Sequence, residues 1–196
     1  IMILEFPNYV SDKDIDTISS AVNPYIDHSQ THMHNRDGKT VNISRTEGLR
    51  EADILLQNIF VGLHQSLISR RYRPIRESAD QDYEYHRYDK GQVCHYHTDG
   101  EFAGEPSDSC LLRYASIILH LNTIKEGGEL VFPAQNKTIK TEKGKIIVFP
   151  PYGTYGHYTT PSPEVREVVV TWFVYSDIIV TLMKNNNLAI PTKLVP

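Results

Sequence analysis

A change of hydrophobic period near Tyr83 constrains the fold of this chain more than any other feature. Before it, apolar residues recur at three- and four-residue steps between Glu47 and Arg71, which is the pattern of an amphipathic helix. After it, alternating apolar and polar residues form short segments bounded by glycine and proline, which predicts strands separated by turns. Helices followed by closely spaced strands indicate a mainly β, α+β domain, with N-terminal helices packed on one outer face of a barrel or sandwich.

Seven strands are predicted in the second half of the chain. They cover residues 83–88, 93–97, 113–122, 129–132, 138–141, 145–149 and 167–175. The short apolar run 2–6 predicts a further strand at the edge of the sheet. Ser11 is placed to cap a helix that ends at Asn23-Pro24, because serine favours the N-cap and the residue before a proline disfavours helix.

The polar stretch 25–46 lies between the two predicted helices. It contains three histidines, His28, His32 and His34, together with the turn signal Asp37-Gly38. The spacing of these histidines fits no compact set of metal ligands, so a mobile surface loop is the expected structure.

Length and charge set the class of protein. With 196 residues, 40% of them hydrophobic, the chain is expected to form one domain with helical support (1–82), a catalytic β-core (83–176) and a C-terminal appendage (177–196). A net charge of −4 argues against a general nucleic-acid or anionic-membrane binder. Two cysteines make no disulfide framework, and no apolar run suggests a signal peptide or membrane span. A soluble cytoplasmic protein is therefore expected, and its oligomeric state is left open.

The pair His97-x-Asp99, followed much later by His157, supplies candidate metal ligands. Alternate side chains of an extended strand share a face, so one metal ion can take both members of the pair. Two histidines and one carboxylate with open coordination positions are typical of non-haem Fe(II) oxygenases. His95 shares the same face and is a candidate to line the pocket, while packing or support of the metal ligands is the alternative role.

The stretch from Tyr83 to Tyr175 resembles the catalytic core of the Fe(II)/2-oxoglutarate-dependent dioxygenases, specifically the prolyl-4-hydroxylase-like group. The resemblance covers about half of the chain, and it implies a double-stranded β-helix, a jelly-roll or cupin-like barrel. The joint pattern is more specific than any single piece. In order, the matching pieces are Tyr88-x-x-Gly91, His97-x-Asp99, Arg113 leading into Leu119-His120-Leu121-Asn122, Gly127-Gly128-Glu129-Leu130, Phe132-Pro133, Gly144, Phe149, His157, Arg166 and Trp172.

Carried over residue by residue, the resemblance implies three iron ligands, His97, Asp99 and His157. It also implies that Arg166, nine residues after His157, pairs with the distal carboxylate of 2-oxoglutarate. A planar guanidinium suits that role, because it can grip a carboxylate with two parallel hydrogen bonds. Tyr88 matches a tyrosine that helps to hold the co-substrate. His120 stands where many relatives carry a tyrosine that contacts the same carboxylate. Which other side chains contact this carboxylate besides Arg166 therefore stays open.

The activity that the resemblance implies is hydroxylation of an unactivated C–H bond, with release of succinate and CO2. Fe(II), 2-oxoglutarate and O2 are the expected cofactors and co-substrates, and ascorbate is a further candidate. The expected substrate is a prolyl residue of a peptide or protein, while free amino acids and other small molecules stay open.

Two other classes are consistent with parts of the pattern. A cupin-type metalloprotein would use His95, His97, Glu101 and His157 and would need no 2-oxoglutarate. A non-catalytic β-barrel binding module would not require a complete ligand set. The position of Tyr88 and the glycine that follows it, ahead of His97, favours the oxygenase.

Overall fold

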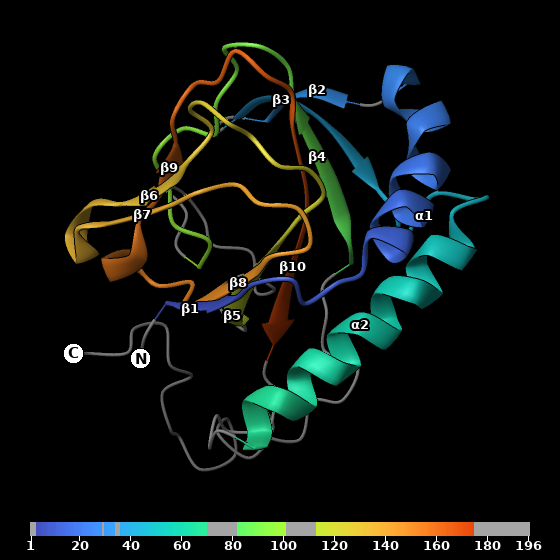
Figure 1. The fold of residues 1–196 in the computed structure, drawn as a ribbon, viewed down its shortest axis with the longest axis horizontal. Coiled ribbons are helices and arrows are strands. Elements are labelled where there is room, and N and C mark those ends of the chain that lie inside the picture. Colours follow the sequence, from blue (N-terminus) through green and yellow to red (C-terminus); the bar gives the residue numbers. More distant parts are fainter. Residues whose placement is uncertain (1–2, 29, 34–35, 70–81, 101–112, 175–196) are drawn as a thin grey trace, which may run out of the picture.

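The computed structural model describes residues 3–28, 30–33, 36–69, 82–100 and 113–174 and consists mainly of two antiparallel sheets (Figure 1). The larger sheet has the order β1-β8-β5-β10-β4-β3-β2, and the smaller one β7-β6-β9. The larger sheet contains β1 (Leu4–Phe6), β2 (Gln30–Met33), β3 (Arg36–Asn42), β4 (Glu84–Tyr88), β5 (Arg113–His120), β8 (Ile146–Phe149) and β10 (Arg166–Val174). The smaller contains β6 (Leu130–Phe132), β7 (Lys137–Ile139) and β9 (Tyr158–Thr159). Three 3₁₀ turns, η1 (Asn23–His28), η2 (Pro133–Gln135) and η3 (Gly153–Tyr155), complete these elements.

Two helices, α1 (Asp12–Val22) and α2 (Arg50–Ser69), lie side by side next to the larger sheet (Figure 1). The Ser11 hydroxyl accepts the backbone N–H of Asp14 at 3.2 Å, so the expected N-cap of α1 is confirmed. Buried residues recur on each helix at three- and four-residue steps, and they share one core cluster with a face of the larger sheet. Members of this cluster include Ile15, Ile18, Val22, Leu56, Phe60, Leu63, Ile117, Leu119 and Val169.

The other face of the larger sheet packs against the smaller sheet. Ile118, Val168 and Val170 alternate with the helix-facing residues and join Leu130 and Phe132 of β6 in a second core cluster. The two clusters follow directly from the alternation of side chains along β5 and β10. The candidate site described below lies within the second cluster, between the two sheets.

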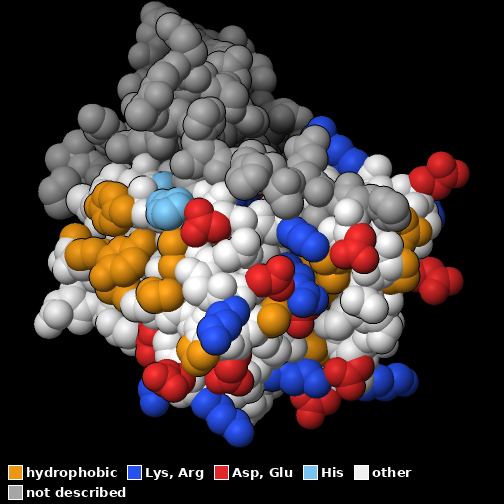
Figure 2. All heavy atoms as spheres, turned by 90° about the horizontal axis from the view of Figure 1, so that it is seen from above, with side chains coloured by type: hydrophobic (Ala, Val, Ile, Leu, Met, Phe, Trp, Pro, Cys, Tyr) orange, Lys and Arg blue, Asp and Glu red, His pale blue; other side chains and the backbone are white. Residues whose placement is uncertain are grey.

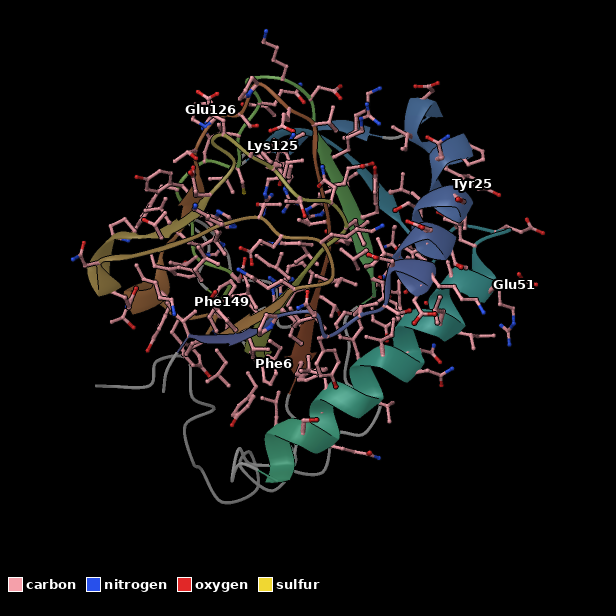
Figure 3. The ribbon with its side chains drawn as sticks, in the orientation of Figure 1. Phe6, Tyr25, Glu51, Lys125, Glu126 and Phe149 are labelled. Carbon is pink, nitrogen blue, oxygen red and sulfur yellow. The ribbon has the colours of Figure 1, made fainter. Side chains whose placement is uncertain are left out.

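Most of the predicted strands are present, with ends shifted by one or a few residues. The strand at 2–6 is found as β1 at the edge of the larger sheet, paired with β8, as predicted. The sticks in Figure 3 show Phe6 of β1 and Phe149 of β8 within the body of the protein. Lys125 and Glu126 lie on an outer loop and Glu51 on the outer side of α2.

The prediction of a surface loop over residues 25–46 was wrong. This stretch forms η1 and the hairpin of β2 and β3, and β3 pairs antiparallel with β4. Pairing in the sheet satisfies the backbone of β3, so this strand forms although its sequence, Arg-Asp-Gly-Lys-Thr-Val-Asn, is largely polar. His34 and the side chains of His28 and His32 lie outside the part that the structure describes.

The strand predicted over 93–97 is also absent. Only isolated bridges occur there, between Cys94 and Arg36 and between His97 and His157. The segment 177–196, predicted as an appendage, and Cys110 lie outside the described residues.

None of the helices in the described residues is long and apolar enough to cross a membrane. On the face shown in Figure 2, lysine and arginine side chains alternate with aspartate and glutamate. Exposed pairs such as Lys143 with Asp16, at 2.7 Å, each contribute little to stability, because water screens them.

The turn at Gly127-Gly128 leads into β6 and gives a stability prediction. Gly127 has φ +70°, and a Cβ at this position would lie 2.0 Å from the backbone oxygen of Pro161. Gly127→Ala should therefore lower the free energy of unfolding by at least ~2 kcal/mol, from backbone strain and the clash together. Gly91 is the matched control, because it has φ +79° but open space around its Cβ position, and Gly91→Ala should cost only ~1 kcal/mol. Urea unfolding of both variants measures the difference, and equal losses would contradict the role of the contact.

Candidate active site

His97, Asp99 and His157 come together at the site, and one ligand atom from each lies within 4.8 Å of the others. His97 Nε2 lies 3.3 Å from Asp99 Oδ1, and the two imidazole rings have centroids 4.4 Å apart. Asp99 and His157 are buried, and His97 is nearly so. The grouping that was predicted from the sequence is therefore present, although it does not depend on a regular strand.

Backbone pairing, rather than strand alternation, positions the two histidines. The N–H of His97 donates to the carbonyl of His157 at 3.0 Å, and the N–H of His157 donates to the carbonyl of His97 at 2.9 Å. This double contact fixes the two Cα atoms opposite each other although sixty residues separate them in sequence. On the other side, the carbonyl of Asp99 accepts from Arg113 Nη1 at 2.6 Å.

Each imidazole is oriented by a hydrogen bond from its Nδ1. His97 Nδ1 lies 2.8 Å from the carbonyl oxygen of His95, and His157 Nδ1 lies 3.1 Å from that of Tyr155. A carbonyl oxygen only accepts, so Nδ1 carries a proton in both rings. This arrangement directs Nε2 of each ring toward a shared ligand and is the usual support of a metal-binding histidine.

The three groups shift one another's pKa values strongly. Burial alone would lower the pKa of His97, but hydrogen bonds and charge interactions with Asp99 and Cys94 raise it to about 10. Burial lowers the pKa of His157 to about 4, despite the nearby Asp99 carboxylate. Burial acts to raise the pKa of Asp99, but the two histidines outweigh it and hold that pKa well below its usual range. Without metal at pH 7, the site therefore holds one carboxylate, one imidazolium and one neutral imidazole.

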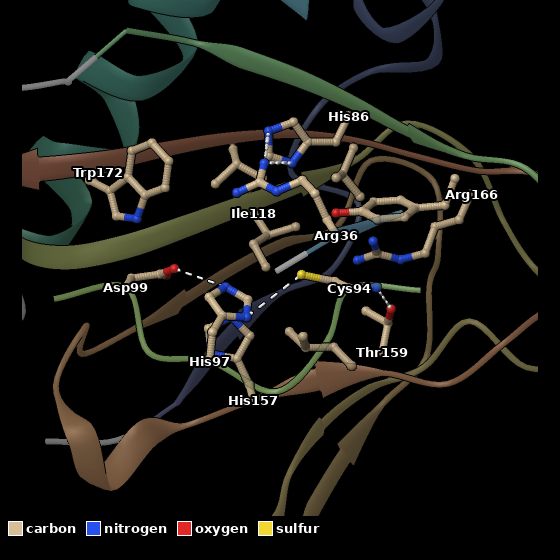
Figure 4. Close-up of a pocket in the computed structure, with 14 residues that line it drawn as sticks. Arg36, His86, Cys94, His97, Asp99, Ile118, His157, Thr159, Arg166 and Trp172 are labelled. Carbon is tan, nitrogen blue, oxygen red and sulfur yellow. Dashed lines mark hydrogen bonds and ion pairs between the residues drawn. The ribbon is translucent and has the colours of Figure 1, made fainter. Parts of the chain in front are cut away.

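Arg166 lines the same pocket as the three groups (Figure 4). Tyr88 lines it as well. Arg166 begins β10, is only 4% exposed, and lies with its guanidinium carbon 5.4 Å from the centre of the Tyr88 ring. Arg166 Nε is 3.4 Å from Thr141 Oγ1. Within the described residues, no carboxylate lies at ion-pair distance from this guanidinium. A buried cation of this kind is suited to a carboxylate ligand.

His120 is fully buried on β5, opposite Val168 of β10, and does not itself line the pocket. Its Nδ1 accepts the backbone N–H of Glu142 at 3.2 Å, so the proton of the neutral ring is on Nε2. Burial, and then the positive charge of Arg166, lower the pKa of His120 well below its usual value. Among the described residues, His120 Nε2 has no hydrogen-bond partner, which leaves a buried donor beside Arg166.

His95 does not join the site. Its side chain is 55% exposed, and its Nε2 lies 2.8 Å from Asp37 Oδ1. The expectation that His95 lines the pocket was wrong, because the strand from which it was derived is absent. Glu101, the other residue required by the cupin alternative, lies outside the described residues. The group that the structure assembles contains Asp99 in place of His95.

The pocket also contains residues to which the sequence assigned no role in the chemistry. Arg36, the first residue of β3, lines it from the hairpin that was not predicted. Cys94 is a buried thiol whose sulfur lies 3.7 Å from His97 Nδ1. Trp172 lies under the guanidinium of Arg113, 3.7 Å from the ring centre, and its indole N–H is buried without a partner in the part of the chain that the structure describes. The alternation of side chains along β10 places Trp172 on the face of the sheet that meets the pocket. The polar sequence of the β2–β3 hairpin gave no comparable indication that Arg36 lines the pocket.

Comparison with known proteins agrees with this arrangement. Residues 83–174 match the sequence profile of the 2OG-Fe(II) oxygenase superfamily. No curated protein matches the sequence.

Several solved structures share the fold at low sequence identity. A viral collagen prolyl hydroxylase from Paramecium bursaria Chlorella virus-1, in its 2OG complex, has a TM-score of 0.68 at 22% identity, over 89% of this chain and 96% of that chain. A Pseudomonas putida prolyl-4-hydroxylase has a TM-score of 0.65 at 15% identity, over 89% and 92%. A Trichoplax adhaerens prolyl hydroxylase, in complex with a hypoxia inducible factor oxygen degradation domain peptide fragment, has a TM-score of 0.67 at 16% identity, over 88% and 83%.

The profile match covers all three grouped residues and Arg166, and the structural matches cover most of the chain. Residues 83–174 therefore resemble the 2OG-Fe(II) oxygenase superfamily, and the chain has the fold of the solved prolyl hydroxylases.

Proposed function

We propose that this protein is an Fe(II)- and 2-oxoglutarate-dependent dioxygenase that hydroxylates a prolyl residue of a peptide or protein, releasing succinate and CO2. The observation that carries the proposal is the grouping of His97, Asp99 and His157 in one pocket with the buried cation Arg166. Metal ligands alone would fit many metalloproteins. A carboxylate-binding arginine in the same pocket favours a 2-oxo acid co-substrate.

The residues present fit Fe(II). Two imidazole nitrogens and one carboxylate oxygen form the donor set of non-haem Fe(II) oxygenases, and they leave coordination positions open. Both Nδ1 atoms are engaged by carbonyls, so Nε2 of His97 and of His157 would bind the metal together with the Asp99 carboxylate. When bound, Fe(II) with 2-oxoglutarate supplies the oxygen activation that an unactivated C–H bond requires.

The residues around Arg166 fit the distal carboxylate of 2-oxoglutarate. The guanidinium offers charge and a planar pair of donors, and His120 offers the buried Nε2–H beside it. An unsatisfied buried donor costs about 1–3 kcal/mol, so a ligand that accepts this hydrogen bond recovers that cost. In this proposal His120 stands where many related enzymes carry a tyrosine, and its neutral Nε2–H lies behind the pocket lining, near Arg166. Tyr88 lines the cavity beside Arg166.

The substrate assignment rests on the solved structures that share this fold. The similar structures are prolyl hydroxylases, and the Trichoplax adhaerens enzyme was solved with a peptide fragment. In this chain, Trp172, Ile118 and Val170 give the pocket an apolar wall that suits a pyrrolidine ring. An apolar wall beside a metal also excludes water from the reacting C–H bond.

Anaerobic titration with Fe(II) and 2-oxoglutarate tests the cofactor assignment directly. A weak visible charge-transfer band is expected when 2-oxoglutarate chelates the bound metal. Metal binding without the band would contradict the dioxygenase and favour the cupin-type alternative. Absence of metal binding would favour a non-catalytic module. Proline-containing peptides, assayed for succinate formation and for hydroxyproline, then test the substrate.

Metal binding should release one proton at neutral pH. In the metal-free site, the Nε2 proton of His97 faces Asp99 and occupies the place of the metal, and the pKa of His97 is about 10. His157, with a pKa of about 4, has no proton to lose at pH 7. The apparent affinity for Mn(II) should therefore rise by about tenfold per pH unit between pH 6 and 8. Calorimetry in buffers of different ionisation enthalpy measures the proton release, and a pH-independent affinity would contradict the assignment.

The raised pKa of His97 also makes the stability of the metal-free protein depend on pH, in the sense opposite to that of metal affinity. The pKa of His97 is raised from 6.5 to about 10 on folding, so its ion pair with Asp99 stabilises the protein fully below about pH 6.5. That stabilisation is lost as the pH rises toward 10. Metal affinity and metal-free stability are thus expected to change with pH in opposite senses.

A further inference from the structure

An exposed tyrosine lies against the backbone at the point where the two candidate metal-binding histidines are paired. Tyr96 precedes His97 and is 62% exposed. Gly156 precedes His157 and is buried. A Cβ on Gly156 would overlap the hydroxyl oxygen of Tyr96 and the ring carbon that carries it, and it would lie 2.9 Å from the next ring carbon, Cε2. The outer end of the tyrosine ring therefore packs directly on Gly156.

This contact spans two segments that are paired at isolated points instead of along a continuous ladder. His97 and His157 form an isolated bridge, in which each backbone N–H donates to the carbonyl of the other residue. Further along, the N–H of Thr159 donates to the carbonyl of Cys94 at 2.9 Å. With little regular pairing on either side of the bridge, side-chain packing across it has more influence on its geometry than it would have in a regular sheet.

The contact also joins the two peptide groups that orient the imidazoles. His97 Nδ1 donates to the carbonyl of His95, and the peptide group of that carbonyl ends at the Cα of Tyr96. The carbonyl that accepts from His157 Nδ1 belongs to the residue before Gly156, so its peptide group ends at the Cα of Gly156. Because a peptide group is planar, its oxygen moves when either of the two Cα atoms that bound it moves. A shift of Tyr96 or Gly156 therefore moves an oxygen to which an imidazole is hydrogen-bonded.

We infer that Tyr96 is a positioning residue for the metal site: by packing on Gly156, it keeps the two imidazoles in the relative orientation that a shared metal ion requires. The rings of His97 and His157 lie next to each other, with centroids 4.4 Å apart and planes inclined at 56° (Figure 4). Metal ligands need to be held to within about 0.5 Å of their working geometry, so a small rotation of either ring weakens binding. This inference rests on the metal site of the proposed function and adds to it a residue that does not itself contact the metal.

Removal of the contact from either side tests the inference. Gly156 has φ −56° and ψ 135°, which alanine adopts without strain, so in Gly156→Ala only the new methyl group displaces Tyr96. Tyr96→Ala removes the ring itself. In isothermal titration calorimetry, each variant should bind Mn(II) about tenfold more weakly than the wild type, the lower end of the range for residues that support metal ligands. Tyr96→Phe keeps the ring and should stay within about twofold of the wild type, since loss of one exposed hydroxyl rarely disturbs a site.

The double variant shows whether the effect arises at the contact. Both substitutions remove the same packing, so Tyr96→Ala combined with Gly156→Ala should lose no more affinity than the weaker of the two single variants. Independent effects would instead multiply to a loss of about a hundredfold. Gly62→Ala is the matched control, because its Cβ would also face a tyrosine hydroxyl, that of Tyr9, but at an ordinary contact distance of 3.5 Å and on α2. Its affinity for Mn(II) should equal that of the wild type.

Stability and spectroscopy separate positioning from support of the fold. Tyr96 is exposed, so the urea midpoint of the metal-free protein should be unchanged in Tyr96→Ala while the metal affinity falls. At saturating Co(II), the visible absorption reports the coordination geometry, and it should differ between Tyr96→Ala and the wild type. Wild-type affinity in both single variants, a multiplicative loss in the double variant, an unchanged Co(II) spectrum, or a loss of stability without a loss of affinity would each overturn the inference.

The outcomes also separate this inference from the proposed function. If the wild type binds Mn(II) and the variants bind it equally well, the inference fails and the proposed function stands. If Mn(II) binding depends on Tyr96 but 2-oxoglutarate gives no charge-transfer band with Fe(II), the positioning role stands and the dioxygenase assignment fails. A wild-type protein that binds no Mn(II) would contradict both.

Discussion

Replacing Asp99 with alanine is expected to abolish succinate formation while the protein stays folded. Asp99 supplies the carboxylate of the proposed ligand set and lies 3.3 Å from His97 Nε2. Loss of a residue that only supports a metal ligand usually reduces metal affinity or activity by 10- to 100-fold, so loss of the ligand itself should exceed about 100-fold. Without the carboxylate, the two imidazoles alone hold the metal weakly and in no fixed geometry.

The fold should tolerate this change because the two core clusters do not depend on Asp99. The side chain is buried in a segment without regular secondary structure. Its removal ends both the cost of burying its charge and the ion pair with His97, whose imidazole can then become neutral. The expected loss of unfolding free energy is below about 2 kcal/mol, and circular dichroism and urea unfolding measure it. Asp99→Asn preserves the shape and should be equally inactive.

His95→Ala is the matched control for Asp99→Ala. His95 belongs to the same segment, but it is exposed and contacts Asp37 instead of the site. Its activity should stay within about twofold of the wild type, since surface substitutions rarely disturb a site. If His95→Ala were inactive and Asp99→Ala active, the cupin-type ligand set would replace the one proposed here.

The β-core could be predicted from the sequence because its strands are rich in apolar residues. On β5 and β10 one face meets the helices and the other meets the pocket, so apolar residues mark both faces. His97, Asp99 and His157 could be selected as candidate metal ligands as well, because their residue types and order match the two-histidine, one-carboxylate set of non-haem Fe(II) sites.

The contacts that position these residues could not be predicted. The pairing of His97 with His157 is a backbone contact between distant loops, and no side-chain period encodes it. The strand predicted over 93–97 was derived from local alternation, and that derivation also misplaced His95. Local pattern describes which face a residue would have in a strand, but tertiary pairing decides whether the strand exists.

The hairpin of β2 and β3 was missed for a related reason. β3 carries polar residues and a glycine, which indicate a loop when they are judged alone. Its stability comes from the edge of β4, to which it adds a strand. Arg36 was missed with it, and so was the second positive charge of the pocket.

Arg166→Gln should weaken 2-oxoglutarate binding by at least about 100-fold, because a buried charged hydrogen-bond partner is worth 2–5 kcal/mol in binding. Glutamine keeps a donor but loses both the charge and the planar fork. Arg87→Gln is the matched control, since Arg87 lies on neighbouring β4 but pairs with Asp89 at 2.8 Å outside the pocket. The anaerobic absorbance titration measures both affinities.

The same substitution is expected to leave the unliganded protein as stable as the wild type, or more stable. Burial lowers the pKa of Arg166, which reflects the cost of placing its charge among apolar residues, and no described carboxylate at ion-pair distance offsets that cost. Replacing a buried charge with a neutral side chain is often neutral or stabilising. In the wild type, 2-oxoglutarate should therefore raise the Tm above the value reached with Mn(II) alone. In Arg166→Gln, 2-oxoglutarate should give no further increase in Tm over Mn(II) alone. An arginine that served only the fold would give the reverse result, with a large loss of stability and an unchanged co-substrate affinity per folded molecule.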